Sequence, residues 1–230
     1  MIASTPSLPL PIIAVNVGLP APLTDARTGK VTMTGISKHA VTADHVTVRF
    51  TNILGDGQAD LQNHGGPDKA VYCYSHEHLP AWRSEIGYPG DRRAPFGENL
   101  SVTGAIEDCA HIGDRWQWGD VVLEVAQPRW PCFKLGLHSG LHDLPARLIA
   151  NERSGWYCRV VTEGDAPTTD ACLTLLRHVT DAPTVRKAFQ AARGLLPPDD
   201  ALRISGTPAL ADRWRSMILR RYGGAMEEPK

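Results

Sequence analysis

Residues 120–134 read DVVLEVAQPRWPCFK and join a strand-like run to a single thiol. Residues 121–126 are mostly β-branched or apolar, which predicts a strand. The two prolines cannot continue a strand ladder, so we expect Cys132 on a stiff connection just after that strand. Arg129 and Lys134 flank the thiol, and nearby cations favour the thiolate, which attacks electrophiles and ligates soft metals. An isolated cysteine is more often a buried structural residue, and two other segments bear on the choice.

The second segment, residues 55–71, reads GDGQADLQNHGGPDKAV. It is polar, rich in glycine and too long for a tight hairpin, and it leads into a predicted strand at 70–74. Gly65 and Gly66 permit positive φ, so successive backbone N–H groups can converge on an anion. His64 and Lys69 could add positive charge to a bound phosphate. The alternative is an ordinary surface loop of turn-forming residues. The spacing matches neither a P-loop nor a dinucleotide fingerprint.

The third segment, residues 95–102, reads PFGENLSV and predicts a turn followed by a short strand. Asn99 would stand at the mouth of that strand. Its amide can both donate to and accept from a polar heterocycle. The alternative is that the amide satisfies local backbone groups in the turn.

The order and spacing of these segments resemble the MOSC family, named for the C-terminal domain of molybdenum cofactor sulfurases, and in particular its stand-alone, YiiM-like bacterial branch. The resemblance covers roughly residues 11 to 222. Trp130 departs from the pattern, where a smaller or polar residue is expected, and it could narrow the pocket beside Cys132. The matching stretches are 55–60, 64–71, 96–100, 113–114, 127–129, 131–132 and Lys134.

The resemblance implies a molybdenum–pyranopterin cofactor bound in a β-barrel-like domain, and it implies that Cys132 either carries sulfur or ligates molybdenum. We expect Cys132 to be both the catalytic residue and the molybdenum ligand, and we expect no zinc, flavin or Fe–S cluster, because the residues show no signature for them. The resemblance also implies that the enzyme reduces small N-hydroxylated compounds to amines. The residues expected to anchor the cofactor are His64, Gly65, Gly66, Lys69, Asn99, Arg129 and Lys134.

Two alternatives to the reductase stay open at this stage. The chain could be a sulfur carrier that delivers sulfur through a Cys132 persulfide, or a non-catalytic carrier of the cofactor. The sulfur carrier would need a sulfur-generating partner, because the chain has no pyridoxal-phosphate domain. The reductase would need a separate flavin or Fe–S protein as electron donor, because no such signature occurs in the sequence.

Composition adds limits on partners and compartment. The chain has 230 residues, a net charge of −1 and 42% hydrophobic residues, which suits one sizeable folded domain rather than a nucleic-acid-binding protein. Five cysteines with no C-x-x-C pair favour reduced thiols in a cytoplasmic protein. The stretch Met1 to Pro11 lacks the cationic start of a signal peptide, and no apolar run is long enough to span a membrane.

The pattern of elements predicts a mainly β fold, a β-barrel-like MOSC domain with inserted helices, followed by a small three-helix C-terminal region. Short β-rich runs with turn formers between them favour a barrel. Helices are expected at about 75–86 and 144–152, and then at 182–193, from 197, and from 207 to 223. We predict a flexible tail at 1–10, the barrel domain at 11–180, the helical region at 181–224 and a tail at 225–230.

Overall fold

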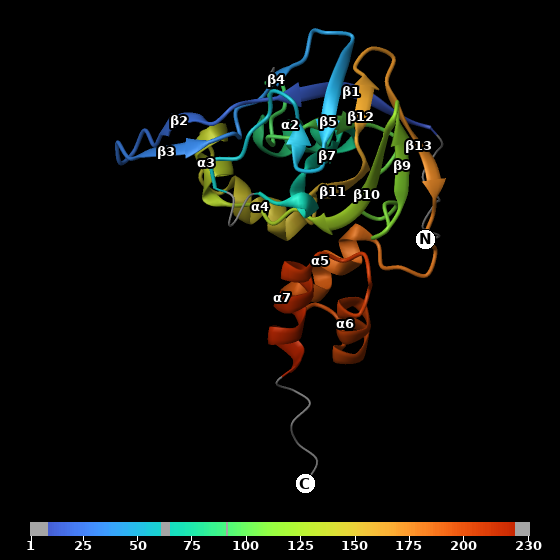
Figure 1. The fold of residues 1–230 in the computed structure, drawn as a ribbon. Coiled ribbons are helices and arrows are strands. Elements are labelled where there is room, and N and C mark those ends of the chain that lie inside the picture. Colours follow the sequence, from blue (N-terminus) through green and yellow to red (C-terminus); the bar gives the residue numbers. More distant parts are fainter. Residues whose placement is uncertain (1–8, 61–64, 91, 224–230) are drawn as a thin grey trace.

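The computed structural model describes residues 9–60, 65–90 and 92–223. In this part of the chain the centre is a closed seven-stranded barrel (Figure 1). The strands β7 and β8 run parallel and the other barrel pairs are antiparallel. The barrel strands, in order around the barrel, are β1 (Leu10–Val17), β13 (Cys172–Arg177), β9 (Arg115–Trp118), β10 (Val121–Pro128), β11 (Trp156–Thr162), β7 (Val71–Ser75) and β8 (Leu100–Val102).

Alternating apolar side chains hold the barrel together from inside. On β10, Leu123 and Val125 are fully buried, and on β11 Cys158 and Val160 are buried opposite them. Every apolar Å² removed from water contributes about 25 cal/mol, so this continuous interior is the main source of stability. The predicted strand at 121–126 is confirmed and extends to Pro128.

Short strands outside the barrel form part of the rim of the cavity that is described below. A hairpin of β2 (Ala21–Thr24) and β3 (Val31–Thr34) projects from the body (Figure 1). A small sheet joins β5 (His45–Arg49), β6 (Asn52–Ile53) and β12 (Gly164–Pro167), and β4 (His39–Ala40) pairs with β1. The two-residue strands β4 and β6 are too short for the residue pattern to predict them.

Five helical segments, three of which carry residues of a second apolar cluster, are inserted between the barrel strands. They are the two 3₁₀ turns η1 (Pro67–Lys69) and η2 (His76–His78), with α2 (Leu79–Ile86), and the pair α3 (Phe133–Ser139) and α4 (Leu144–Asn151). In the cluster, the Trp82 indole donates to the Tyr74 hydroxyl over 2.7 Å, and Phe96 stacks on Tyr74. The expected helix at 75–86 is therefore shorter, because Ser75 ends β7 and its hydroxyl bonds Glu77 instead of capping a helix.

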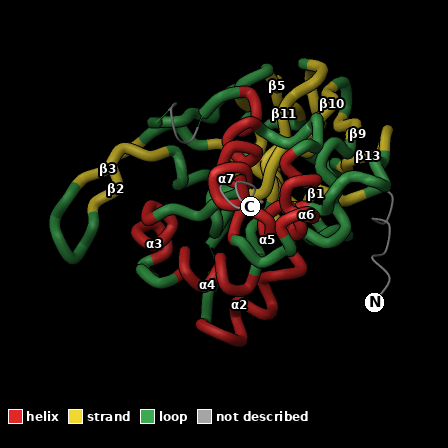
Figure 2. The backbone as a smooth tube through the Cα atoms, turned by 90° about the horizontal axis from the view of Figure 1, so that it is seen from below, coloured by secondary structure: helices red, strands yellow, loops and turns green. Residues whose placement is uncertain are grey.

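The C-terminal helices α5 (Val185–Arg193), α6 (Pro198–Ser205) and α7 (Asp212–Tyr222) pack together at one end of the barrel (Figures 1 and 2). Thr184 caps α5 by accepting the Lys187 N–H, which shortens the predicted helix at its start. The third helix begins at Asp212 rather than at 207, because a turn closed by Leu210 N–H to Thr207 O precedes it.

The mainly β fold with inserted helices and a three-helix end is thus confirmed. Within the described residues, no helix is both long and apolar enough to cross a bilayer.

The buried carboxylate of Glu107 ties the η2 turn to the segment before β11. It lies 2.7 Å from His78 Nε2 and accepts the Gly155 N–H over 2.7 Å. Burial alone would raise the pKa of Glu107, but the His78 contact and the Gly155 bond together lower it below the ordinary glutamate value. The folded protein therefore stabilises the ionised carboxylate of Glu107 relative to the protonated carboxyl group.

We expect Glu107 to make the free energy of unfolding depend on pH in the acid range. A carboxylate with a depressed folded pKa stabilises fully above its unfolded pKa of about 4.5, and this contribution is lost as pH falls through the lower folded value. Glu107→Gln should therefore lower the free energy of unfolding most near neutral pH, and the difference from wild type should shrink below about pH 4.5. Urea unfolding of both proteins from neutral to acid pH measures this, and a constant difference would contradict it.

Candidate functional site

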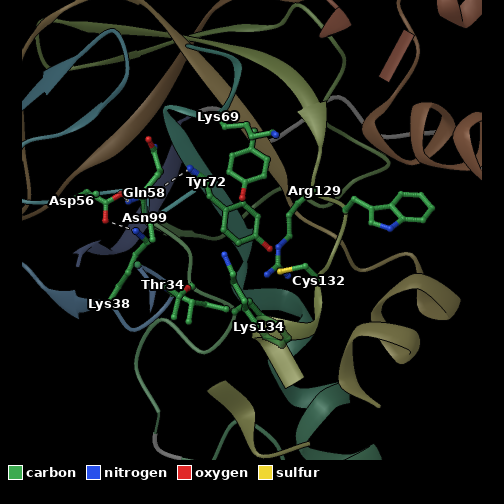
Figure 3. Close-up of a pocket in the computed structure, with 18 residues that line it drawn as sticks. Thr34, Lys38, Asp56, Gln58, Lys69, Tyr72, Asn99, Arg129, Cys132 and Lys134 are labelled. Carbon is green, nitrogen blue, oxygen red and sulfur yellow. Dashed lines mark hydrogen bonds and ion pairs between the residues drawn. The ribbon is translucent and has the colours of Figure 1, made fainter. Parts of the chain in front are cut away.

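A cavity opens beside β7, between the loops that surround the start of that strand. Its empty volume is about 660 Å³. Figure 3 shows two groups of side chains across it: Asp56, Lys38 and Asn99 on one side, and Arg129, Cys132 and Lys134 on the other. Six separate parts of the sequence meet here, namely 34–38, 56–59, 69–72, 96–99, 129–134 and Tyr157.

Cys132 lies where β10 has ended and α3 begins. Its backbone is extended, with φ −122° and ψ 171°, and its side chain is half-buried. The thiol faces the Arg129 guanidinium on the same wall of the cavity (Figure 3), and its charge bears on both Arg129 and Tyr157. The stiff connection predicted after the strand is therefore only four residues long, and the helix α3 that follows it was not predicted.

The helix α3 is held against the opposite loop by His138. Its Nδ1 lies 3.2 Å from the Ser37 hydroxyl, and its backbone oxygen accepts from the Arg92 guanidinium. Burial, with the charges of Arg92 and Arg129 nearby, lowers the pKa of His138 to about 4, so the ring is neutral at physiological pH. Cys132 thus precedes a helix whose C-terminal end is held by two contacts of His138.

Arg129 is the most unusual group of the site. The residue is 6% exposed, and its Nη1 atom is fully buried without a hydrogen-bond partner. Its Cζ lies 5.1 Å from the centre of the Tyr72 ring. None of the ion pairs formed within the described residues involves Arg129. A buried guanidinium donor without an acceptor is costly, so this atom is available to a bound anion.

Two lysines add positive charge from different elements. Lys134 is buried on α3, two residues after the thiol, and Lys69 ends the turn η1. Burial lowers the pKa of the Lys69 ammonium, and the Arg213 guanidinium lowers it further, while Asp68 and Asp60 oppose both effects. An anion near Lys69 would relieve the repulsion from Arg213.

The opposite wall is organised by the carboxylate of Asp56. It accepts the Gly18 N–H over 2.9 Å and the Asn99 amide over 2.9 Å, and it pairs with Lys38. The Asn99 side chain also donates to Asn16 O over 3.1 Å and accepts the Tyr72 N–H over 3.0 Å. Asn99 therefore lines the cavity while its own bonds go to the protein, so its contact with a heterocycle stays a prediction.

Sequence reasoning missed Lys38 and the tyrosines of the wall. Lys38 is buried against Asp56, and burial lowers its pKa while Asp56 opposes the shift. A Cβ on Gly35 would come within 2.1 Å of Gly57 O, so these two glycines let the loops touch. Gly35 and Gly57 are therefore the sequence feature that could have indicated this loop contact and, with it, Lys38. Tyr157 could not be found, because it faces the cavity only through the pairing of β11 with β7.

The described anchoring residues largely converge. Lys69, Asn99, Arg129, Cys132 and Lys134 all line the cavity. Gly65 and Gly66 lie on the approach to η1, where Gly66 has a φ of 95°, outside the lining. His64 lies outside the described residues. Trp130 lines the cavity together with Cys132, and its ring also packs on Phe189 and Trp214.

The cavity fits an anionic group that carries a metal with its own ligands. The Asp56 charge is already matched by Lys38, which leaves the orphaned Arg129 with Lys134 and Lys69 facing the space. Among residues 9–60, 65–90 and 92–223, no cluster of three His, Cys, Asp or Glu could hold a bare metal ion. One thiol can complete the coordination of a metal that arrives on an organic ligand, but it cannot build a site alone.

A closed β-barrel with one thiol in a cationic cavity defines a class of cofactor-binding proteins. Comparison with known families agrees, since residues 60–173 match the model of the MOSC domain. The chain belongs to the MOSC domain family, a molybdenum-cofactor-binding family.

Relatives extend the match to nearly the whole chain. The protein YflK of Bacillus subtilis is 36% identical over 91% of this chain and 93% of its own. The crystal structure of YiiM from Geobacillus stearothermophilus superposes with a TM-score of 0.76 and 29% identity, covering 93% of this chain and 100% of that one. A protein of Gibberella moniliformis named reductase is 39% identical over 50% of this chain, which is 21% of that protein.

We expect Arg129→Met to weaken cofactor binding without lowering the free energy of unfolding. Methionine has a similar length but removes the unpartnered buried charge, so the free energy of unfolding should stay the same or rise. Loss of one charge-assisted bond, worth about 1.5–3 kcal/mol, should weaken binding of the phosphate-bearing cofactor by about tenfold to a hundredfold. Cofactor occupancy and thermal unfolding measure the two effects.

Arg115→Met is the matched control. Arg115 pairs with Glu124 over 2.7 Å outside the cavity lining, so this variant should lose a little stability and keep its cofactor. Equal cofactor occupancy in Arg129→Met and wild type would show that Arg129 does not bind the cofactor.

Proposed function

We propose that this protein is a molybdenum-dependent reductase that converts N-hydroxylated compounds to amines, with Cys132 as the metal ligand. The observation that carries the proposal is the buried Nη1 atom of Arg129, which has no hydrogen-bond partner, at the cavity that Cys132 also lines. Membership of a molybdenum-cofactor family and a relative named reductase support the oxidoreductase class.

The chain's own residues have separate roles in this proposal. Cys132 supplies the thiolate ligand, while Arg129, Lys134 and Lys69 neutralise the anionic groups of the cofactor. Lys38 and Asp56 form a neutral pair on the opposite wall and keep the loop 56–59 in place. When bound, the molybdenum centre would supply the two-electron chemistry that removes the hydroxyl oxygen.

The overall reaction consumes two electrons and two protons for each N–OH bond broken, and it releases the amine and water. The cavity offers one thiol among cations and tyrosines, and the sequence carries no flavin or Fe–S signature that could supply these electrons. We therefore propose a separate flavin or Fe–S protein as the electron donor. The Gibberella relative matches this chain over only 21% of its own length, so a MOSC-like segment can be part of a longer protein named reductase.

The distribution of cysteines favours the reductase over a sulfur carrier. Cys132 lines the cavity, whereas the other four cysteines do not. Cys73 and Cys158 are buried in contact with each other inside the barrel, and this contact and burial raise the pKa of the Cys73 thiol well above its usual value. A thiol held neutral in an apolar core is a poor relay for sulfur.

Cys132→Ser should keep the fold and lose N-hydroxylamine reduction. A serine hydroxyl stays protonated and is a harder ligand, so the molybdenum–sulfur distance contributed by the protein should disappear from the X-ray absorption spectrum. Cys109→Ser and Cys172→Ser, which change half-buried thiols outside the cavity, serve as controls with activity kept. Full reduction by Cys132→Ser with metal still bound would remove the ligand role. An additional essential cysteine would favour sulfur transfer.

Lys69→Ala tests whether the η1 loop holds the cofactor phosphate. Loss of one charge-assisted bond should lower cofactor retention by about tenfold to a hundredfold, with little change in the thermal stability of the cofactor-free protein. Lys69→Arg should rescue only in part, because a planar fork does not replace a point charge. A titration of cofactor occupancy at matched expression measures this. Equal occupancy in Lys69→Ala and wild type would place the phosphate beside Arg129 and Lys134 instead.

A further inference from the structure

The loop that carries the thiol is attached to the C-terminal helices by one side chain. The ring centre of Trp130 lies 5.4 Å from that of Phe189 on α5 and 6.0 Å from that of Trp214 on α7. Phe189 and Trp214 are buried and lie 5.9 Å from each other, so the helices present a ready-made aromatic surface. Trp130 itself is 41% exposed, which means that it is the outer member of this cluster.

Few backbone bonds hold the loop between β10 and α3. Arg129 N–H donates to Gly155 O over 3.2 Å, and Cys132 O accepts from Leu135 N–H over 3.0 Å. Pro131 has no N–H to give. The side chains must therefore set the course of this segment. Arg129 turns inward over the Tyr72 ring, and Trp130 turns outward onto the helices.

The helical region can serve as a fixed base because the barrel holds it at other points. Ala211 N–H at the start of α7 donates to Ala126 O on β10 over 3.0 Å, and Val185 N–H donates to Ala110 O over 2.8 Å. Arg159 also joins the two parts, since it donates to Ala209 O over 3.0 Å while pairing with Asp68 next to Lys69. None of these bonds involves Trp130, so they would survive its replacement.

We propose that Trp130 is a positioning residue, which uses the C-terminal helices as a base to hold Arg129 and Cys132 in place on the cavity wall. The three-helix region then orders the loop through the two ring contacts of Trp130, although none of its helices supplies a residue to the cavity lining among the described residues. The consequence for turnover rests on the proposed reductase function, but the ordering of the loop does not.

The test compares Trp130→Ala with two matched variants. Trp130→Phe keeps a ring that can reach Phe189. Phe133→Ala removes another aromatic side chain that lies next to Cys132 in the sequence. Phe133 is 61% exposed, and no ring among the described residues contacts it. Hydrogen exchange of the cofactor-free proteins, followed on the peptide spanning residues 129–136, reports the loop without any need for activity.

We expect exchange in this peptide to be about tenfold faster in Trp130→Ala, as two lost aromatic contacts imply. Exchange in peptides from β7 should not change, and Trp130→Phe and Phe133→Ala should match wild type within about twofold. Unchanged exchange in Trp130→Ala, or an equal increase in Phe133→Ala, would overturn the proposal. Faster exchange along β7 as well would also overturn it, because it would report general destabilisation.

A second measurement connects the loop to turnover. In cofactor-loaded protein of equal occupancy, Trp130→Ala should lower kcat with an N-hydroxylated substrate and leave KM nearly unchanged, and Trp130→Phe should restore kcat. A rise in KM alone would assign Trp130 to the substrate pocket instead and overturn the positioning role. If wild type shows no reductase activity, the proposed function fails, and the exchange experiment still decides whether Trp130 orders the loop.

Discussion

One buried carboxylate makes the cavity possible. Asp56 accepts from the Gly18 backbone and the Asn99 amide and pairs with Lys38, and Asn99 in turn accepts the Tyr72 N–H. The chain segments around β1, β7 and β8 are joined by these few bonds. A buried carboxylate is stable only if all its acceptor positions are used, so the partners are held in fixed geometry. The loop 56–59 can then line a cavity instead of closing over it.

The opposite wall of the cavity differs from the Asp56 wall in its hydrogen bonding. There, a guanidinium nitrogen is buried without a partner, and two lysines face the same space from different elements. Such a wall is costly in the empty protein and is stabilised by an anion, whereas the Asp56 wall is satisfied by itself. An anionic ligand would complement this contrast between the paired Asp56 carboxylate and the unpartnered Arg129 Nη1.

Sequence reasoning found the features that depend on local chemistry. The β-rich body, the long strand before the thiol and the three C-terminal helices could be predicted, because residue type and helix punctuation are local signals. The cluster of Lys69, Arg129, Cys132 and Lys134 came from family resemblance, and the structure brings these residues to one cavity. Lys38 and Tyr157 were missed, because only loop contacts and strand pairing bring them there. The outward turn of Trp130 could not be predicted either, since its partners lie about 60 and 84 residues further along the chain.

The closure of the barrel carries a consequence for how the protein forms. The first barrel strand meets the last, with Leu10 opposite Leu173 and Pro11 opposite Cys172. This pairing closes a loop of more than 160 residues, so the entropy of joining the ends must be met before the barrel interior is sealed. Folding of such non-local topologies is slow compared with that of helical proteins. Strands β9 and β10 form a local hairpin and can assemble earlier, which leaves the closing β1–β13 pair as the expected late step.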